Sequence, residues 1–414
     1  MTEHQAVVLL LDLGLIILLA RALAALARKL DQPAVLGEIL AGILVGPTLF
    51  HGAIANALFP ADVRPLLSAI ANVGIAVFMF LMGLDLDRDL LRGRNGTIVT
   101  VSLGAMLLSL ATGVALGFFL HRDHPSVPAL GFALFVGAAV AVTAFPVLAR
   151  ILTDRDLHRT PLGGLALACA AIDDVLAWLV LAAVLTIVGG HASPLRTLLL
   201  VPYLALCVFA VRPLLSRLLR VGGADRLTVN KLAVLIAGLL LSGGLTEWLG
   251  LHFIFGAFLF GLLVPRADFA ALRRRVVGRV EQVNGVFFVP VYFIVAGLNV
   301  NLSHLDADGL LELGLILLVA IGSKFGGAYL TARARNLPRR EAAALATLMN
   351  TRGLTELIIL STGLQLGVLD TKLYSLMVVM AVLTTAMAGP LLRVIRPPRF
   401  VPAPETEALA RKPA

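Results

Sequence analysis

The chain has 414 residues, of which 59% are hydrophobic and only 14% are charged. No soluble domain of this length has such a composition, so we predict a protein that crosses a membrane many times. The formal net charge of +9 therefore gives no argument for nucleic-acid binding, and we expect no nucleic-acid partner. Both cysteines, Cys169 and Cys207, lie inside apolar segments, so no disulfide framework is expected.

Apolar segments follow one another along nearly the whole chain. A helix of about 20 residues is long enough to cross a hydrocarbon core of about 30 Å. The segments predict an all-α polytopic membrane protein with about thirteen transmembrane helices. Two segments, 33–50 and 251–265, are short and bounded by Gly or Pro, so we expect tilted or partial helices there. The predicted spans are 6–28, 33–50, 65–86, 97–120, 128–152, 161–188, 196–216, 228–247, 251–265, 283–301, 309–330, 341–366 and 371–392.

Basic residues are distributed unevenly between the two sets of loops. Outside the spans, nearly all Lys and Arg lie in the loops of one side and in the C-terminal segment; the exceptions are Arg64, Arg122, Arg196 and Lys372. Cytoplasmic loops carry an excess of such residues. We therefore expect the plasma membrane (the bacterial inner membrane), with the N-terminus outside and the C-terminus in the cytoplasm. The Pro-rich segment 396–414 is expected to be a short disordered cytoplasmic tail.

Two motifs recur in the same order along the chain. VLGEILAGILVGP (35–47) resembles IFGAFLFGLLVP (254–265), and VFMFLMGLDLD (77–87) resembles VYFIVAGLNVN (291–301). The copies are separated by an odd number of spans, so the two halves cross the membrane in opposite senses, as in many secondary transporters. We expect one transmembrane domain over residues 1–395, with a first repeat, a linker helix and a second repeat at about 6–188, 196–216 and 228–392.

Two adjacent carboxylates, Asp173 and Asp174, lie near the middle of the span 161–188. Asp173 lies about 18 Å from one end of this helix, close to the bilayer midplane. An acidic side chain there costs about 2.5–3.5 kcal/mol on insertion scales, and adjacent acids repel one another. Because intramembrane carboxylates mark ion and proton pathways, we predict that this pair binds and releases a cation or a proton. The alternative is a pair of neutralised structural acids facing a buried cavity.

Two spans are interrupted at corresponding places of the two halves. Pro146 lies well inside its span, where a proline removes a backbone hydrogen bond and frees carbonyl groups. Asn350, Thr351, Arg352 and Gly353 form a polar break inside the twelfth span. Such breaks occur where the backbone lines a cavity or is buried in protein, and they point to transporter binding sites. We expect two broken helices in which the C-terminus of a half-helix offers carbonyls and a negative dipole end to a cation.

The remaining charges at membrane depth need partners. Lys324 is the cation of an otherwise apolar span, and Asp173 or Asp174 is its natural partner. Successive helix residues point about 100° apart, so one aspartate can be held by Lys324 while the other faces the ion path. Arg352 and Glu356 have the spacing of a local ion pair. For these two, a structural role beside the break and a direct transport role are both open.

Three further residues stand out with weaker patterns. Glu38 lies near the start of a short span and is expected to be structural, by hydrogen bonding a neighbour near the helix end. Trp178 follows Asp174 by one turn and is expected to line the site rather than bind the ion. His252 borders a short span and is expected to lie at the membrane interface.

At these residues the sequence resembles the monovalent cation:proton antiporters, in the branch that holds bacterial Kef-type, plant CHX-type and NapA-like sodium exchangers. The resemblance covers about residues 6–395. It implies the Na⁺/H⁺ antiporter fold of thirteen helices, with a dimerisation part, a core part, two crossing broken helices, and a homodimer. The motifs that carry the resemblance are Gln32–Pro47, Phe80–Asp87, Val142–Leu152, Ala170–Trp178, Ser323–Gly327 and Asn350–Ile358.

The resemblance also assigns roles to individual residues. In the family's motif the second acid, here Asp174, is the principal cation and proton carrier. The position of Asp173 is often Asn in electroneutral members; where it is Asp, the lysine at Lys324 can pair with it, as in electrogenic exchange. Thr143 matches a threonine of the family's first broken helix, and the resemblance implies that it is a cation ligand. Kef-type proteins carry a regulatory nucleotide-binding domain, which we do not expect after Arg396.

The sequence thus predicts a secondary active antiporter that exchanges Na⁺ or K⁺ for protons by alternating access. We expect no enzyme activity and no cofactor; the transported cation and proton are substrates that compete for Asp174 and Asp173. One alternative is a proton-coupled exporter of an organic ion on the same scaffold, and another is an ion channel or sensor. An intramembrane aspartyl protease is disfavoured because adjacent residues of one helix cannot face one water from two sides.

Overall fold

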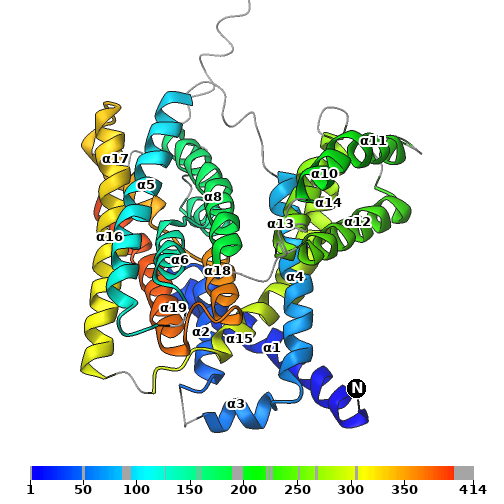
Figure 1. The fold of residues 1–414 in the computed structure, drawn as a ribbon, viewed down its shortest axis with the longest axis horizontal. Coiled ribbons are helices and arrows are strands. Elements are labelled where there is room, and N and C mark those ends of the chain that lie inside the picture. The colour runs from blue at the N-terminus through cyan, green and yellow to red at the C-terminus, as the bar shows by residue number, and fades with distance from the viewer. Residues whose placement is uncertain are drawn as a thin grey trace, which may run out of the picture.

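In the computed structural model, all regular secondary structure of the described residues is helical (Figure 1). These residues are 2–48, 52–85, 95–125, 127–155, 157, 160–188, 199–220, 223, 227–249, 252–265, 269–303 and 306–395. The predicted tail, 396–414, lies outside them, as do the first residues of the predicted linker helix.

Half of the helices form what we call the scaffold group, on the right and at the lower centre of Figure 1. A π-helical turn at Cys207–Val211 joins α10 to α11, and another at Asn284–Phe288 joins α14 to α15. The group consists of α1 (Glu3–Lys29), α2 (Ala34–Val45), α3 (Ala53–Leu58), α4 (Arg64–Asp85), α10 (Leu200–Leu206), α11 (Arg212–Arg220), α12 (Val229–Trp248), α13 (Phe253–Leu263), α14 (Ala270–Val283) and α15 (Val289–Leu298).

The other helices form the core group, on the left of Figure 1. The long helices α5 and α16 pack against each other and cover the shorter α6 and α17. The group consists of α5 (Asn95–Leu120), α6 (Ala129–Ala141), α7 (Phe145–Asp154), α8 (Pro161–Val188), α16 (Ala307–Ala334), α17 (Arg339–Met349), α18 (Leu354–Gln365), α19 (Thr371–Ala386) and α20 (Ala388–Ile395).

The all-α membrane fold predicted from the sequence is confirmed. Ten segments of the described chain are helical, long and apolar enough to cross a membrane, and α2 and α13 are the short apolar helices expected at 33–50 and 251–265. The twelfth predicted span is divided between α17 and α18. The total of thirteen spans stays a prediction.

Glycines bring the two predicted repeats into direct backbone contact. A Cβ added to Gly297 of α15 would lie 2.3 Å from the carbonyl carbon of Gly42 in α2, and one added to Gly83 of α4 would lie 2.2 Å from a backbone oxygen of α13. Real Cβ atoms do not approach so closely, so these helices cross only because the side chains are missing. In both crossings, one recurring motif packs against a copy of the other motif from the opposite half, as two interlocked inverted repeats require.

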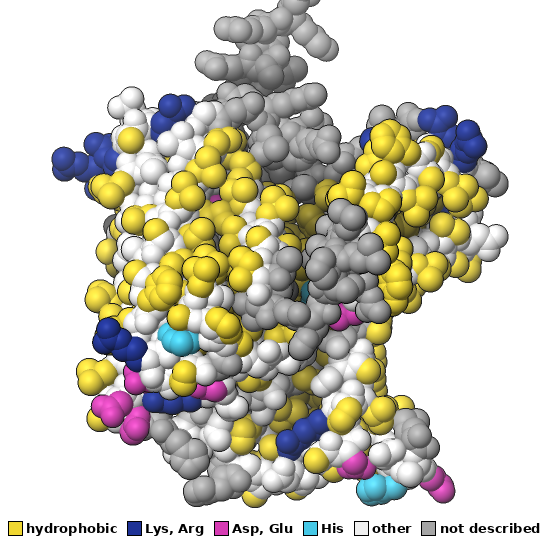
Figure 2. All heavy atoms as spheres, viewed as in Figure 1, with side chains coloured by type: hydrophobic (Ala, Val, Ile, Leu, Met, Phe, Trp, Pro, Cys, Tyr) yellow, Lys and Arg dark blue, Asp and Glu magenta, His cyan; other side chains and the backbone are white. Residues whose placement is uncertain are grey.

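The surface separates apolar flanks from charged ends. Figure 2 shows hydrophobic side chains over the flanks of both groups, Lys and Arg at the upper end of each group and at a few places in the lower half, and most of the visible Asp and Glu toward the lower end. Apolar flanks are the surface that a bilayer covers. The chain is thus an integral membrane protein.

Candidate functional site: the crossing of two broken helices

The two broken helices meet at their interruptions. Between α6 and α7 the chain is extended, and the N–H of Ala144 donates a hydrogen bond of 3.0 Å to the carbonyl of Thr351, which lies between α17 and α18. The Thr143 hydroxyl lies 2.8 Å from the carbonyl of Met349, the last residue of α17. Pro146 stands in the first turn of α7, where its missing N–H leaves no hydrogen bond unmade. Each break is therefore held by the other.

Two cationic side chains cover the C-terminal end of α6. Lys324, from α16, donates to the carbonyl of Ala141 at 2.5 Å. Arg352 donates from Nη1 to Ala139 at 3.0 Å and from Nη2 to Val140 at 2.7 Å. The last carbonyls of a helix lack helical partners and carry the negative end of its dipole. The sequence did not predict that two protein cations bind these carbonyls.

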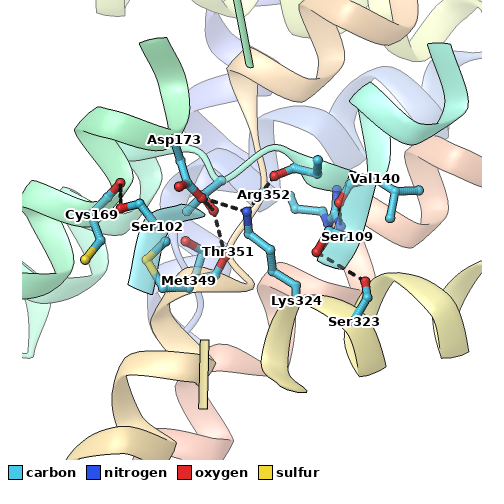
Figure 3. A network of polar contacts seen from close by, with 12 residues as sticks. Ser102, Ser109, Val140, Cys169, Asp173, Ser323, Lys324, Met349, Thr351 and Arg352 are labelled. Atoms are coloured by element: carbon cyan, nitrogen blue, oxygen red, sulfur yellow. Dashed lines mark hydrogen bonds and ion pairs between the residues drawn. The ribbon is translucent and has the colours of Figure 1, made fainter. Parts of the chain in front are cut away.

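Asp173 is held on one oxygen only. Its Oδ2 accepts from Lys324 Nζ at 2.7 Å and from the Thr143 hydroxyl at 2.9 Å. Figure 3 shows Asp173 of α8 and Lys324 of α16 pointing toward one another. Both side chains are 0% exposed, so the pair is a buried ion pair, and Oδ1 has no hydrogen-bond partner. Since Thr143 has one hydroxyl proton, it can donate fully either to Asp173 or to Met349.

Asp174 is buried with very little hydrogen bonding. It is 3% exposed, and its carboxylate oxygens accept no well-formed hydrogen bond among the described residues, although the backbone N–H of Phe145, at the start of α7, interacts with the carboxylate. A buried charged group without hydrogen bonds is strongly disfavoured, so such a carboxyl holds a proton or awaits a cation. Together with Oδ1 of Asp173, the two oxygens of Asp174 give three buried carboxylate oxygens beside the crossing that accept no well-formed hydrogen bond among the described residues.

Arg352 is anchored through both its guanidinium nitrogens Nη1 and Nη2 and its backbone. Its Nη1 lies 3.0 Å from Glu356 Oε1, its backbone N–H donates to the Thr385 hydroxyl at 2.8 Å, and that hydroxyl donates to the backbone carbonyl of Arg352 at 2.8 Å. Of the two roles left open by the sequence, this geometry favours the structural one. Asn350 is buried next to it with its Oδ1 unpartnered.

Sequence reasoning missed two residues, one at the crossing and one in the scaffold group. Thr385 of α19 holds the second break through hydrogen bonds, and the adjacent polar residues Thr384 and Thr385 in an apolar span were the signal that could have found it. Asp12 of α1 is also a buried carboxylate at membrane depth, 4% exposed and with Oδ2 unpartnered. It belongs to the scaffold group, away from the crossing.

The three residues with weaker patterns belong to α2, α8 and the start of α13. Glu38 is buried in α2, and the cationic residues around it are arginines of α1 and α7. Trp178 is buried and meets Phe255 of α13 edge-on at 6.2 Å, so it connects the core and scaffold groups. His252 stands at the start of α13, with its ring 4.5 Å from that of Phe253.

Comparisons with known proteins identify the family. The model of the family described as "Sodium/hydrogen exchanger, transmembrane" matches residues 14–395. The chain belongs to this family. The resemblance drawn from the six motifs is thus confirmed, and the family is one of transporters rather than enzymes.

Named relatives and a solved structure agree with the family. The chain is 36% identical over 408 residues to the Na(+)/H(+) antiporter NhaS4 of Synechocystis, covering 96% of this chain and 99% of that one. It is 30% identical to cation/H(+) antiporter 15 of Arabidopsis thaliana, which covers 94% of this chain but only 48% of the relative. It is also 30% identical to K(+)/H(+) antiporter 1 of Saccharomyces cerevisiae, over 89% of this chain and 44% of the relative. The chain thus spans about half the length of these longer relatives.

The fold matches the sodium proton antiporter MjNhaP1 of Methanocaldococcus jannaschii, with a TM-score of 0.68, 17% identity, and coverage of 94% and 97% of the two chains. Among the described residues, no group of three or more His, Cys, Asp or Glu side chains could hold a metal ion.

Proposed function

We propose that the chain is a secondary active antiporter that exchanges Na⁺ or K⁺ for protons across the membrane. The observation that carries the proposal is Asp174, a buried carboxylate without a well-formed hydrogen bond among the described residues, beside two crossing broken helices. The names of the relatives, which are Na⁺/H⁺, K⁺/H⁺ and cation/H⁺ antiporters, support it.

Competition between cation and proton at Asp174 provides the coupling. A carboxyl that carries a proton is a poor ligand for a hard cation, and a carboxylate that coordinates a cation has released its proton. Binding of one substrate therefore expels the other. Oδ1 of Asp173 and the hydroxyl of Thr143 are the further oxygens that we assign to the cation, because both belong to the same cluster of contacts.

Lys324 and Arg352 position the site rather than carry the ion. They bind the end of α6 from α16 and from the second break, so the two interruptions and α8 form one unit within the core group. We propose that this unit moves against the scaffold group and opens Asp174 to one side of the membrane at a time.

We further propose that the protein lies in the plasma membrane as a homodimer, with the N-terminus outside and the C-terminus in the cytoplasm. The excess of Lys and Arg on one set of loops supports this orientation. The dimer follows from the family resemblance alone.

Exchange in proteoliposomes tests the proposal. The protein is reconstituted with an imposed pH gradient and a pH-sensitive dye, and Na⁺, K⁺, Li⁺ or choline is added in turn. We expect Na⁺ or K⁺ to release protons, Asp174→Asn to lose this response, and Asp12→Asn to keep it. Asp12 is the matched control, because it is also a buried carboxylate but lies in the scaffold group.

Each alternative has its own outcome in this assay. Proton release by choline but not by alkali cations would identify an exporter of organic ions. Cation flux that neither saturates nor moves protons would identify a channel. Equal proton release by Asp174→Asn and the unmodified protein would refute the role of Asp174.

A further inference from the structure

A buried histidine lies at the end of the core group, far from the crossing. His124 belongs to the turn between α5 and α6 and is 3% exposed. Its Nδ1 hydrogen-bonds the carboxylate of Asp370, the N-cap residue of α19. Its Nε2 lies 3.5 Å from Oε2 of Glu312 in α16. Both ring nitrogens therefore face carboxylates that come from different helices.

This arrangement suits the protonated ring only. A neutral imidazole has one N–H, so it can donate to one carboxylate while its other nitrogen presents a lone pair to the second. Burial lowers the pKa of His124, but the hydrogen bond and charge of Asp370 and the charge of Glu312 raise it more, and the pKa lies above its ordinary value. The geometry and the neighbouring charges thus both favour the protonated form of His124.

The other charged groups nearby complete the balance. The Lys372 ammonium lies 3.2 Å from Oε1 of Glu312, so Glu312 is shared between Lys372 and the histidine. Asp306, the N-cap residue of α16, acts on Lys372 from the same end. Arg122 and Asp123 precede the histidine in the turn and are exposed to solvent. When the His124 ring is neutral, Lys372 is the cation that remains to balance the charges of both Asp370 and Glu312.

The helices that meet at this histidine are those that hold the ion site. The turn leads directly into α6, whose last carbonyl binds Lys324. Glu312 and Lys324 lie on the same helix, about 18 Å apart. Asp370 begins α19, which carries Thr385, the clamp on the second break. A change in how the three helix ends are joined therefore acts on elements that reach the crossing.

We propose that His124 is a pH switch of exchange: in its protonated form it ties the start of α6 to α16 and α19, and its deprotonation releases this tie. The proposal rests on the proposed antiport. The tie is fully present below the ordinary pKa of histidine, about 6.5, and it is lost as pH rises through the higher pKa of the folded protein. The tied form restrains the repacking that ion exchange needs, so exchange rises when the tie is lost. In the proposed orientation, this face senses the outside.

The test replaces His124 with a side chain that is never charged, glutamine, and with one that is always charged, arginine. Cation-driven proton release is measured in proteoliposomes as a function of pH, from below the ordinary pKa of histidine upward. We expect His124→Gln to shift the activation midpoint to lower pH, and His124→Arg to shift it to higher pH. Glu312→Gln should shift it in the same direction as His124→Gln and serves if that variant does not fold. The matched control is His121→Gln, since His121 shares the turn but its Nε2 contacts only the carbonyl of Val127, at 2.8 Å.

A second readout does not depend on transport. The melting temperature of the purified protein should fall as pH rises through the folded pKa of His124, and this fall should be absent in His124→Gln but present in His121→Gln. Melting curves with the same pH dependence in all three proteins would overturn the tie. If the melting curves differ as expected but the exchange midpoints of the unmodified protein and His124→Gln are the same, the regulatory role is overturned. Absence of exchange in every protein, the unmodified one included, would count against the antiport itself.

Discussion

Replacing Lys324 with methionine tests whether the ion pair at the crossing holds the core group together. Lys324 and Asp173 are both 0% exposed, with Nζ and Oδ2 2.7 Å apart. Removing one partner of a buried ion pair costs about 3–5 kcal/mol, because the other charge stays buried and uncompensated. The carbonyl of Ala141 also loses its donor, which adds about 1–3 kcal/mol to this cost.

The charge part of this cost should disappear when Asp173 is neutralised as well. We expect Lys324→Met/Asp173→Asn to recover most of the stability lost by Lys324→Met, leaving mainly the share of the Ala141 carbonyl. The free energy of unfolding is measured by denaturant titration in micelles, followed by the emission of Trp178 and Trp248.

Lys372 offers a matched control for the same substitution. It also pairs with a carboxylate, at 3.2 Å from Glu312, but its side chain is 41% exposed. Pairs of this kind contribute about 0–1 kcal/mol, so Lys372→Met should have little effect. The reasoning is refuted if Lys324→Met costs no more than Lys372→Met, or if the double variant is as unstable as Lys324→Met.

Three other predictions follow from particular contacts. Arg352→Lys keeps the charge but cannot bind two carbonyls and a carboxylate together, so the same titration should show a loss of about 1–3 kcal/mol for each carbonyl left unpartnered; an unchanged stability would contradict the anchoring role. Gly297→Ala would push a Cβ into the backbone of α2 and should abolish a monodisperse peak in gel filtration, whereas Gly314→Ala, with no atom within 4 Å of the added Cβ, should behave as the unmodified protein. Burial raises the pKa of Asp370, but hydrogen bonds from His124 and from the start of α19 hold it below its usual value. Its stabilising contribution is therefore present above about pH 4 and lost at lower pH as the carboxylate protonates, so melting temperatures of the unmodified protein and Asp370→Asn should converge on acidification, and parallel curves would argue against this.

The sequence alone determined the class of the protein, its helical segments and the position of its breaks. The span predicted at 161–188 has the same limits as α8. Pro146 predicted the interruption before α7, and the polar run ending at Gly353 predicted the one before α18. These features depend on hydropathy and on backbone chemistry within one segment, so local sequence carries them.

Tertiary structure alone decided which groups meet. Asp173 and Asp174 are adjacent and chemically identical, yet only Asp173 reaches Lys324, which is 151 positions away. The sequence predicted free carbonyls at the end of α6, and packing instead filled them with Lys324 and Arg352. It gave no sign of His124 beside Asp370, 246 positions apart. A side chain's partners depend on how separate helices cross and rotate against one another, and that register is set by packing across the whole bundle rather than by the periodicity of any one helix.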